Sequence, residues 1–290
     1  MIYNIRNEEL SVDINTAGGS LWSIKDKEGT EYLWQGDKTY WGDRAPNLFP
    51  YIARMTDKTY TLFGKEYHMN IHGFVKYMEL SLCEQEGEYL TMELRSNEET
   101  REQYPYEFRY AVTYHLNGKT LEIMYQVTNE DEKDMYFGIG GHPGFNVPLE
   151  EGLSFEDYTI TFAERKEPKR VLFSPDCFVT GEEDYPLKEG KIIPLAHSLF
   201  DDDAIVLGNG ARELVISSEK GKKGVKVSYP KMDYVGFWHK PHTDAPYVCV
   251  EPWSSLPSRM GVVEELSEQK NLICLPKGQT YQNLWSIELL

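Results

Sequence analysis

Two short segments of the chain place a titratable side chain among turn-forming residues. His142 lies in the segment Gly-Gly-His-Pro-Gly, residues 140–144, where glycine and proline favour a turn and let a ligand approach the backbone. Glu251 follows the apolar stretch 247–250, which is typical of a strand, and precedes Pro252. Histidine exchanges a proton near neutral pH and a carboxylate accepts one. The two side chains, each at the exit of a strand, could therefore act as an acid and a base.

Three further positions could surround such a pair. Arg54 ends an apolar run, His72 stands beside glycine in an aromatic setting, and the aspartates 201–203 precede an apolar strand. Each also has an ordinary structural explanation, namely a surface arginine, a hydrogen-bonded histidine and a solvated acidic loop. The same holds for His142 as a turn cap and for Glu251 as a strand-ending surface residue. Only the combination of these residues points to a site.

The composition limits which ligands the chain can bind. Of its 290 residues, 40% are hydrophobic and 13% aromatic, which is enough for a large folded core. The formal net charge of −17 repels phosphate backbones and anionic lipid surfaces, and no basic segment offsets this repulsion. We therefore expect neither nucleic acid nor a membrane surface as a partner, and a neutral small molecule is favoured.

The motif content predicts no metal and no cofactor. The four cysteines, at positions 83, 177, 249 and 274, form no Cys-x-x-Cys pair, and no dinucleotide-binding glycine motif follows a strand. The chain opens directly into sequence typical of a folded protein, without an apolar leader or a run of about 18 apolar residues. We expect a protein of the reducing cytoplasm.

Alternating apolar and polar residues predict antiparallel strands along most of the chain. Three hairpins are indicated, at residues 59–67, 78–94 and 108–127, the last around Asn117-Gly118, which favours a type I′ turn. Further strands are predicted at residues 10–14, 21–24, 158–162, 204–207, 213–217, 225–229, 234–238, 247–250 and 283–290. Short helices are predicted at 98–104 and 262–270, and a long surface loop at 164–190. With no linker or repeat, the prediction is one all-β domain over residues 1–290.

A set of motifs also carries a resemblance to a known family. These motifs are Leu33 to Asp37, Tyr40-Trp41, Asn47 to Pro50 with Arg54, Tyr60 to Tyr67, His72-Gly73-Phe74, Gly141 to Asn146 and Glu251-Pro252-Trp253. In this order, from about residue 10 to the C-terminus, they resemble the aldose 1-epimerase (galactose mutarotase) superfamily, and most of all its LacX-like branch. The resemblance implies a single large antiparallel β-supersandwich with a cofactor-free sugar site on its concave sheet.

The resemblance implies a role for each candidate residue. His142 matches the family's acid, which protonates the ring oxygen, and Glu251 matches the base that takes the proton of the C1 hydroxyl. Arg54 and His72 match residues that hold the hydroxyls of the sugar.

At two positions the chain departs from the family pattern or fits it in two registers. Either Asp203 or Asp202 matches a sugar-binding aspartate of the family, because three consecutive aspartates leave the register open. After the His-Gly-Phe motif the branch often has Ala-Arg, whereas this chain has Val75-Lys76. Lysine does not replace arginine at a bidentate anion site, so the resemblance does not extend to a role in holding phosphate.

We therefore predict an aldose 1-epimerase, a mutarotase that interconverts the α and β anomers of a hexose, acting as a monomer or homodimer. Catalysis would begin with His142 protonated in an acidic site and Glu251 ionised beside Arg54. A hexose-6-phosphate 1-epimerase and a non-catalytic carbohydrate-binding protein are alternatives. A glycoside hydrolase is disfavoured because it needs two opposed carboxylates. The net negative charge and Lys76 favour a free aldose over a sugar phosphate.

Overall fold

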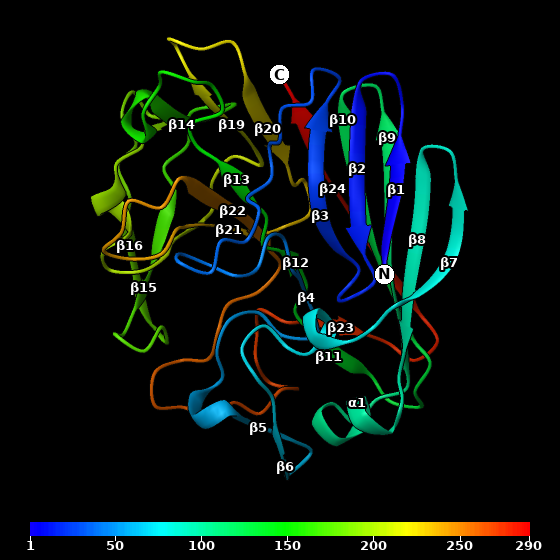
Figure 1. Cartoon of the computed structure of the whole chain (residues 1–290). Helices are drawn as coiled ribbons and strands as arrows, with labels where there is room; N and C mark the ends of the chain where they lie inside the picture. Colours follow the sequence, from blue (N-terminus) through cyan, green and yellow to red (C-terminus); the bar gives the residue numbers. More distant parts are fainter.

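Two large antiparallel sheets make up most of the computed structural model, which describes residues 1–290 (Figure 1). The larger sheet has nine strands, which in sheet order are β17 (Ile192–Pro194), β14 (Tyr158–Phe162), β19 (Glu213–Ser218), β20 (Gly224–Ser228), β24 (Thr280–Leu289), β10 (Thr120–Asn129), β9 (Phe108–Asn117), β8 (Tyr89–Arg95) and β7 (Ser81–Glu86). The second sheet has eight strands, which are β16 (Val179–Asp184), β15 (Lys169–Phe173), β18 (Ile205–Gly208), β21 (Tyr234–Trp238), β22 (Tyr247–Trp253), β12 (Gly140–Gly141) and β4 (Asn47–Leu48), with β13 (Gly144–Asn146) also paired to β22.

The remaining elements are small. The short sheets comprise β1 (Ile2–Arg6), β2 (Leu10–Asn15) and β3 (Ser20–Asp26), then β5 (Thr59–Leu62) with β6 (Lys65–His68), and β11 (Met135–Phe137) with β23 (Ile273–Leu275). The helical turns are η1 (Thr56–Lys58), η2 (Val75–Tyr77), η3 (Phe155–Asp157) and η4 (His197–Phe200). The α-helix α1 (Glu98–Gln103) confirms the helix predicted at residues 98–104, and its N-cap Asn97 accepts a 3.0 Å hydrogen bond from the Thr100 amide.

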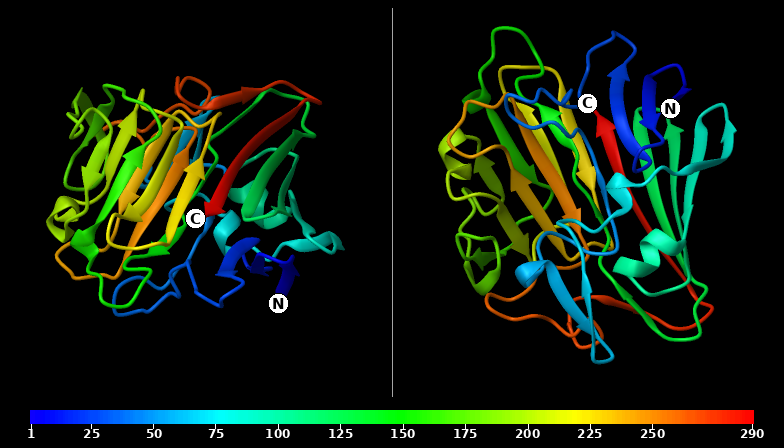
Figure 2. Two further views of the ribbon diagram at one scale, coloured as in Figure 1. Left: turned by 90° about the horizontal axis from the view of Figure 1, so that it is seen from above. Right: turned by 60° about the horizontal axis from the view of Figure 1, so that its bottom comes forward.

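Side-chain alternation along β21 and β22 decides which residues enter the core and which face the other way. Val248 and Val250 belong to the main hydrophobic core. The ring centroid of Phe237 on β21 lies 6.1 Å from that of Phe162 on the larger sheet. The two sheets therefore pack face to face, as the adjacent layers in Figure 2 show. Because successive side chains point to opposite faces, Glu251 is directed away from this core. The antiparallel β-sandwich predicted from the sequence is confirmed.

A single cluster of 64 buried hydrophobic residues extends from Ile5 to Leu289. A core that draws on both ends of the chain supports the one-domain prediction, which stays a prediction. No helix has both the length and the apolar composition that a membrane-spanning helix requires.

The turn between β9 and β10 differs from its prediction. The hairpin lies where expected, but its loop residues are Gly118 and Lys119, because Asn117 pairs with Thr120. Among these loop residues only Gly118 has a positive φ, of 58°. A type I′ turn needs positive φ at both central positions, so that prediction was wrong.

The predicted loop at residues 164–190 contains a hairpin. Strands β15 and β16 pair there and form the edge of the eight-stranded sheet. All but one of the β16 residues are exposed, and its sequence ends in Glu182, Glu183 and Asp184. A strand at a sheet edge that buries neither face lacks apolar alternation, so its sequence resembles a loop.

The helix predicted at residues 262–270 is wrong, because contacts with β5 and its turn hold this segment in a single bridge at Glu265 followed by turns. The Thr61 amide donates to the Glu264 carbonyl, and the Leu266 amide donates to the Thr61 carbonyl, both at 2.8 Å. The Glu265 carboxylate accepts from the Phe63 amide at 2.9 Å. These long-range bonds override the helical periodicity of the segment.

Candidate functional site

Glycines bring His142 against the centre of the eight-stranded sheet. The residue directly follows β12, which pairs with β22 through Gly140 and Trp253. A Cβ atom at Gly140 would lie 2.6 Å from the Pro252 carbonyl oxygen, and one at Gly141 would lie 2.7 Å from the Trp285 ring. A larger residue at Gly140 would push β12 away from β22, and one at Gly141 would push it away from β24 of the larger sheet, so the glycines set the position of the imidazole.

Glu251 lies inside β22 rather than at its exit. The strand continues to Trp253, and Glu251 is opposite Gly236 of β21 and only 2% exposed. The sequence expectation of a strand exit at Glu251 is therefore wrong. Pro252 does not end the strand, because it is opposite Val235 within an antiparallel ladder that continues on both sides.

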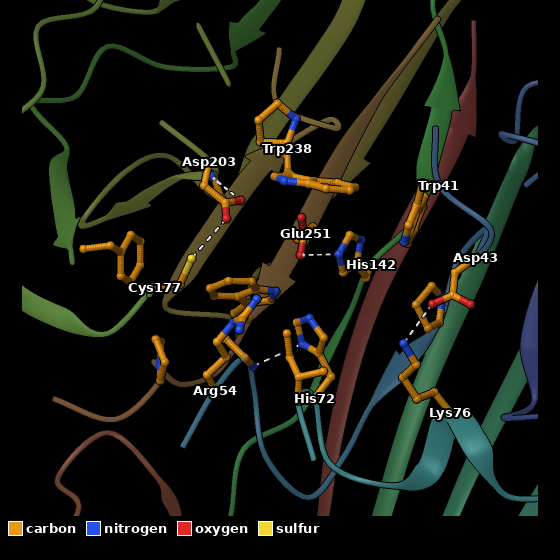
Figure 3. A pocket seen from close by; sticks show the side chains of 18 residues that line it. Trp41, Asp43, Arg54, His72, Lys76, His142, Cys177, Asp203, Trp238 and Glu251 are labelled. Atoms are coloured by element: carbon orange, nitrogen blue, oxygen red, sulfur yellow. Dashed lines mark hydrogen bonds and ion pairs between the residues drawn. The ribbon is translucent and has the colours of Figure 1, made fainter. Parts of the chain in front are cut away.

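The two residues form the buried floor of a pocket of about 370 Å³. His142 Nε2 lies 3.2 Å from Glu251 Oε2, and the side chains are 10% and 2% exposed (Figure 3). His142 Nδ1 has no hydrogen-bond partner within the protein. An imidazole and a carboxyl at this distance can share a proton, and one imidazole nitrogen remains for another ligand.

Burial changes the charge state expected for this pair. Burial, and then the positive charge of Lys76, lower the pKa of His142 to about 3. Burial, and then the charge of Asp203, raise the pKa of Glu251 well above its usual value. Both shifts favour the uncharged forms, so the sequence expectation of a protonated His142 and an ionised Glu251 does not describe the free site. One proton remains on the pair, and burial favours its position on Glu251.

His72 lies beside His142 with a fixed tautomer. The two rings meet edge to face with centroids 5.4 Å apart. His72 Nδ1 accepts a hydrogen bond of 3.1 Å from the Ala53 amide, and burial holds the pKa of His72 well below its usual range. A neutral imidazole that accepts at Nδ1 carries its proton on Nε2. His72 therefore offers a hydrogen-bond donor in the pocket lining.

Asp203 and Cys177 form a hydrogen-bonded unit in the lining on another side of the pocket (Figure 3). The Cys177 thiol donates to Asp203 Oδ2 at 3.0 Å, and the Ala204 amide donates to Oδ1 at 2.9 Å. Asp202 does not line this pocket and instead lines a neighbouring hollow. The aspartate whose register the sequence left open is thus placed in the pocket at position 203.

The cations of the lining are Arg54 and Lys76. Lys76 is held by Asp43, with Nζ 2.8 Å from Oδ2, and Arg54 takes part in no ion pair. Arg44 does not line the pocket, because its guanidinium lies 4.0 Å from the centre of the Trp22 ring and donates to Gln35. The free arginine is therefore the available cationic donor for a ligand.

Two tryptophans flank the imidazole of His142. The Trp41 ring stacks on it with centroids 4.8 Å apart. The Trp238 ring is nearly perpendicular to it, with centroids 5.9 Å apart. A third tryptophan, Trp253, lies two residues after Glu251. That ring also lines the pocket, but it is 4% exposed and packs in a small core cluster with residues such as Leu48. Flat aromatic faces beside a proton-transfer pair suit a sugar ring.

Sequence reasoning identified five of the pocket residues and missed others. It did not assign a role to Trp41, Trp238, Cys177 or Asp43, all of which line the pocket. The signal for Trp41 was an aromatic pair in an otherwise polar loop. Nothing in the local sequence of Cys177 distinguishes it from the other cysteines.

The whole chain matches known proteins that share this architecture. The family model of aldose 1-epimerase matches residues 1–288. Protein LacX (chromosomal) of Lactococcus lactis is 36% identical over 265 residues, covering 88% of each chain. A galactose mutarotase-like protein from Lactobacillus casei has a TM-score of 0.95 at 32% identity, with each chain fully covered. A galactose mutarotase related enzyme from Lactobacillus acidophilus has a TM-score of 0.94 at 31% identity, covering 100% of this chain and 97% of its own. The chain belongs to the aldose 1-epimerase family.

Proposed function

We propose that the chain is an aldose 1-epimerase that interconverts the α and β anomers of an unphosphorylated hexose. The observation that carries this proposal is the buried contact of 3.2 Å between His142 Nε2 and Glu251 Oε2. Ring opening removes a proton from O1 and adds one to O5, and both oxygens are bonded to C1. The acid and the base must therefore lie close together, as these two groups do.

The reaction needs no net proton from the solvent. Glu251 takes the O1 proton while His142 delivers a proton to O5, and the hemiacetal opens to an aldehyde. After rotation about the C1–C2 bond, the two residues exchange roles and the ring closes on the other face. The active tautomer has the shared proton on His142, one transfer across the 3.2 Å contact from the form that burial favours.

The same burial makes both groups more reactive. An imidazolium whose pKa is lowered gives up its proton more readily, and a carboxylate whose pKa is raised accepts one more readily. The buried pair thus combines a strong acid and a strong base without carrying net charge. Each positioned group typically contributes about 10²–10⁴-fold to the rate.

Polar groups around the pair supply contacts for the sugar hydroxyls. His72 and Arg54 act as donors, and the Asp203 carboxylate acts as an acceptor. Trp41 and Trp238 provide apolar faces for the ring carbons. This set is supported by the common pocket lining, with a donor, an acceptor and a cation on different sides of the floor (Figure 3). It needs no cofactor for the proton transfers.

The charges of the lining favour a free aldose over a hexose 6-phosphate. A phosphate dianion is best bound by several unpaired cations, preferably arginine forks. Asp43 already neutralises Lys76, and Asp203 adds another negative charge to the lining, so only Arg54 remains unpaired. Binding the dianion would also bring negative charge close to Glu251.

Polarimetry tests this function against its alternatives. Freshly dissolved α-glucose, α-galactose and their 6-phosphates are followed with and without protein. We expect faster relaxation of at least one free hexose and no comparable effect on its phosphate. A preference for the phosphate would favour the hexose-6-phosphate 1-epimerase. Sugar binding by calorimetry without any acceleration would favour a non-catalytic carbohydrate-binding protein.

A further inference from the structure

The thiol of Cys249 lies beside the catalytic pair but has no role in the proton transfers. Cys249 and Glu251 are two residues apart on β22, so their side chains point to the same face of the sheet. Cys249 is fully buried in a small cluster with Trp34 and Tyr247, and Trp41 and Trp238 pack against this cluster. Its thiol is free and makes no hydrogen bond.

The spacing of three side-chain atoms at this point matches a metal-ligand set. Sγ of Cys249, an imidazole nitrogen of His142 and a carboxylate oxygen of Glu251 all lie within 4.8 Å of one another. Tetrahedral zinc with bonds of about 2.0–2.3 Å places its ligand atoms roughly 3.3–3.5 Å apart. The histidine and glutamate atoms are already 3.2 Å apart. A shift of the thiol by about 1 Å would complete the set.

The chemistry of this set suits a thiophilic divalent cation. Thiolate, imidazole and carboxylate are the ligand types that zinc binds in proteins. One thiolate and one carboxylate neutralise the two charges of the ion, so the filled site has no net charge in a buried environment. The pocket above His142 and Glu251 provides an entry path and space for a water or a sugar hydroxyl as fourth ligand.

We propose that Cys249, His142 and Glu251 form a binding site for one Zn²⁺ ion, which inhibits the enzyme reversibly. The ion binds the two atoms that must exchange protons with the sugar, and so blocks the reaction. Binding forms three bonds from protein to metal and releases two protons to the solvent, one from the thiol and one from the histidine–glutamate pair. No oxidation or reduction is involved. The inhibitory part of this proposal rests on the proposed epimerase function, whereas the binding part does not.

This site is distinct from the histidine pair that has a His-x-x-x-His spacing. His68 and His72 are four residues apart, which would place them on one face of a helix. Here His68 is exposed on β6, whereas His72 is buried in the pocket lining. The proposed site instead brings His142 together with Cys249 and Glu251, which lie 107 and 109 positions further along the chain.

Metal binding is tested first without reference to activity. Wild-type protein, treated with EDTA and then desalted, is titrated with Co²⁺ and with Zn²⁺ in a buffer that does not bind metals. We expect one ion per chain by equilibrium dialysis and a thiolate-to-Co²⁺ charge-transfer band that Zn²⁺ abolishes. Cys249→Ser should remove the band and weaken Zn²⁺ binding at least about tenfold, because serine does not supply the soft ligand.

Two further variants keep the result interpretable. Cys83→Ser changes an exposed thiol and should leave both the band and the zinc affinity unchanged. If Cys249→Ser does not fold, Cys249→Ala serves in its place, since a small apolar side chain suits the buried position. Equal zinc affinity in wild type and the folded Cys249 variant, or a Co²⁺ spectrum without a thiolate band, would overturn the site.

Inhibition is measured next on the same proteins. We expect EDTA-treated wild type to be fully active, to lose activity as one equivalent of Zn²⁺ binds, and to recover when EDTA is added. The folded Cys249 variant should keep its basal activity and need at least about tenfold more Zn²⁺ for inhibition. Binding without loss of activity would refute the inhibitory role. A protein with no epimerase activity would refute the proposed function instead, and the Co²⁺ spectrum would still decide the metal site.

Discussion

The thiol of Cys177 donates a 3.0 Å hydrogen bond to Oδ2 of Asp203, and both residues line the pocket that contains His142 and Glu251. With the other carboxylate oxygen held by the Ala204 amide, the thiol completes the support of the carboxylate. Burial, then the hydrogen bond and charge of Asp203, raise the pKa of Cys177 to about 12, so the thiol stays protonated and remains a donor. Cys177 is therefore a positioning residue for Asp203.

The first prediction concerns this contact. Cys177→Ala should raise KM roughly three- to tenfold with little change in kcat, because a weak donor to a charged acceptor is lost. Cys177→Ser should restore most of the affinity, since a hydroxyl can donate to the same oxygen. Steady-state polarimetry with a free hexose measures both constants, and Cys83→Ala is the matched control at an exposed cysteine. An unchanged KM in Cys177→Ala would show that the thiol does not support substrate binding.

The second prediction concerns the proton-transfer pair. His142→Ala and Glu251→Gln should each lower kcat by about 10²–10⁴-fold, and the double variant should lose little more than the worse single variant, because the pair acts as a unit. Glutamine is preferred to alanine at position 251 because Glu251 is buried inside β22 and truncation would leave a cavity. Circular dichroism checks the fold. A correctly folded variant with a near-normal rate would disprove the assignment of that residue.

The third prediction concerns the pH profile. Because its pKa is lowered, His142 stays neutral at a lower pH than an ordinary histidine does. Because its pKa is raised, Glu251 stays protonated at a higher pH than an ordinary glutamate does. Between the two values the pair holds one proton. Activity should fall on the acid side when a second proton is added near the lowered pKa, and on the alkaline side only when the last proton leaves. The profile of kcat/KM should therefore be a broad plateau around neutral pH, and a narrow optimum between the ordinary glutamate and histidine pKa values would contradict it.

The fourth prediction concerns substrate charge. Asp43→Asn should free Lys76 from its ion pair and increase kcat/KM for a hexose 6-phosphate by roughly three- to tenfold relative to the free hexose. This gain should shrink modestly as salt is added, because ions screen the attraction between Lys76 and a phosphate dianion arriving from solution, although Lys76 itself is only 13% exposed. Asp244→Asn provides a control at an exposed aspartate outside the pocket. A gain that is the same at low and high salt would not come from Lys76.

The fifth prediction concerns stability. Buried Asn47 on β4 donates to the carbonyls of Gly18 and Gly19 at 3.0 Å and accepts from the Tyr125 hydroxyl at 2.8 Å. It thus ties the turn before β3 to the strands that carry His142. Asn47→Ala should lower the free energy of unfolding by roughly 2–5 kcal/mol, because buried carbonyls lose their donor. Urea denaturation measures the loss, with exposed Asn4→Ala as control. A loss below about 1 kcal/mol would show that these bonds contribute little.

The residues that could be predicted from the sequence are those whose chemistry is visible locally. His142 and Glu251 stood out because a titratable group next to glycine or proline suggests both a reaction and a place for it. The hairpins were predictable for a similar reason, since Gly87 and Gly118 sit between alternating strands and both adopt positive φ.

What depended on distant parts of the chain could not be predicted. The position of Trp41 over His142 and the contact between Cys177 and Asp203 follow from how loops fold onto the finished sheet. The charge state of His142 and Glu251 was misjudged because burial, which dominates both pKa shifts, is not encoded in neighbouring residues. The segment 262–270 shows the same limit, because bonds to β5 hold it in a non-helical form.

Beyond the bridge from Val179 to Arg259, strand β16 leaves the outer edge of the eight-stranded sheet without a partner, and acidic residues occupy its last three positions. Such an edge has free amide and carbonyl groups that could pair with the same edge of another copy. In a full-length antiparallel pairing of two copies, however, Glu182 of each strand would lie diagonally beside Glu182 of the other, and a register shift that overlaps the acidic ends would place more like charges opposite one another. Like charges facing each other across strands are destabilising. The edge therefore discourages the chain from polymerising through its own sheet while it remains open to solvent.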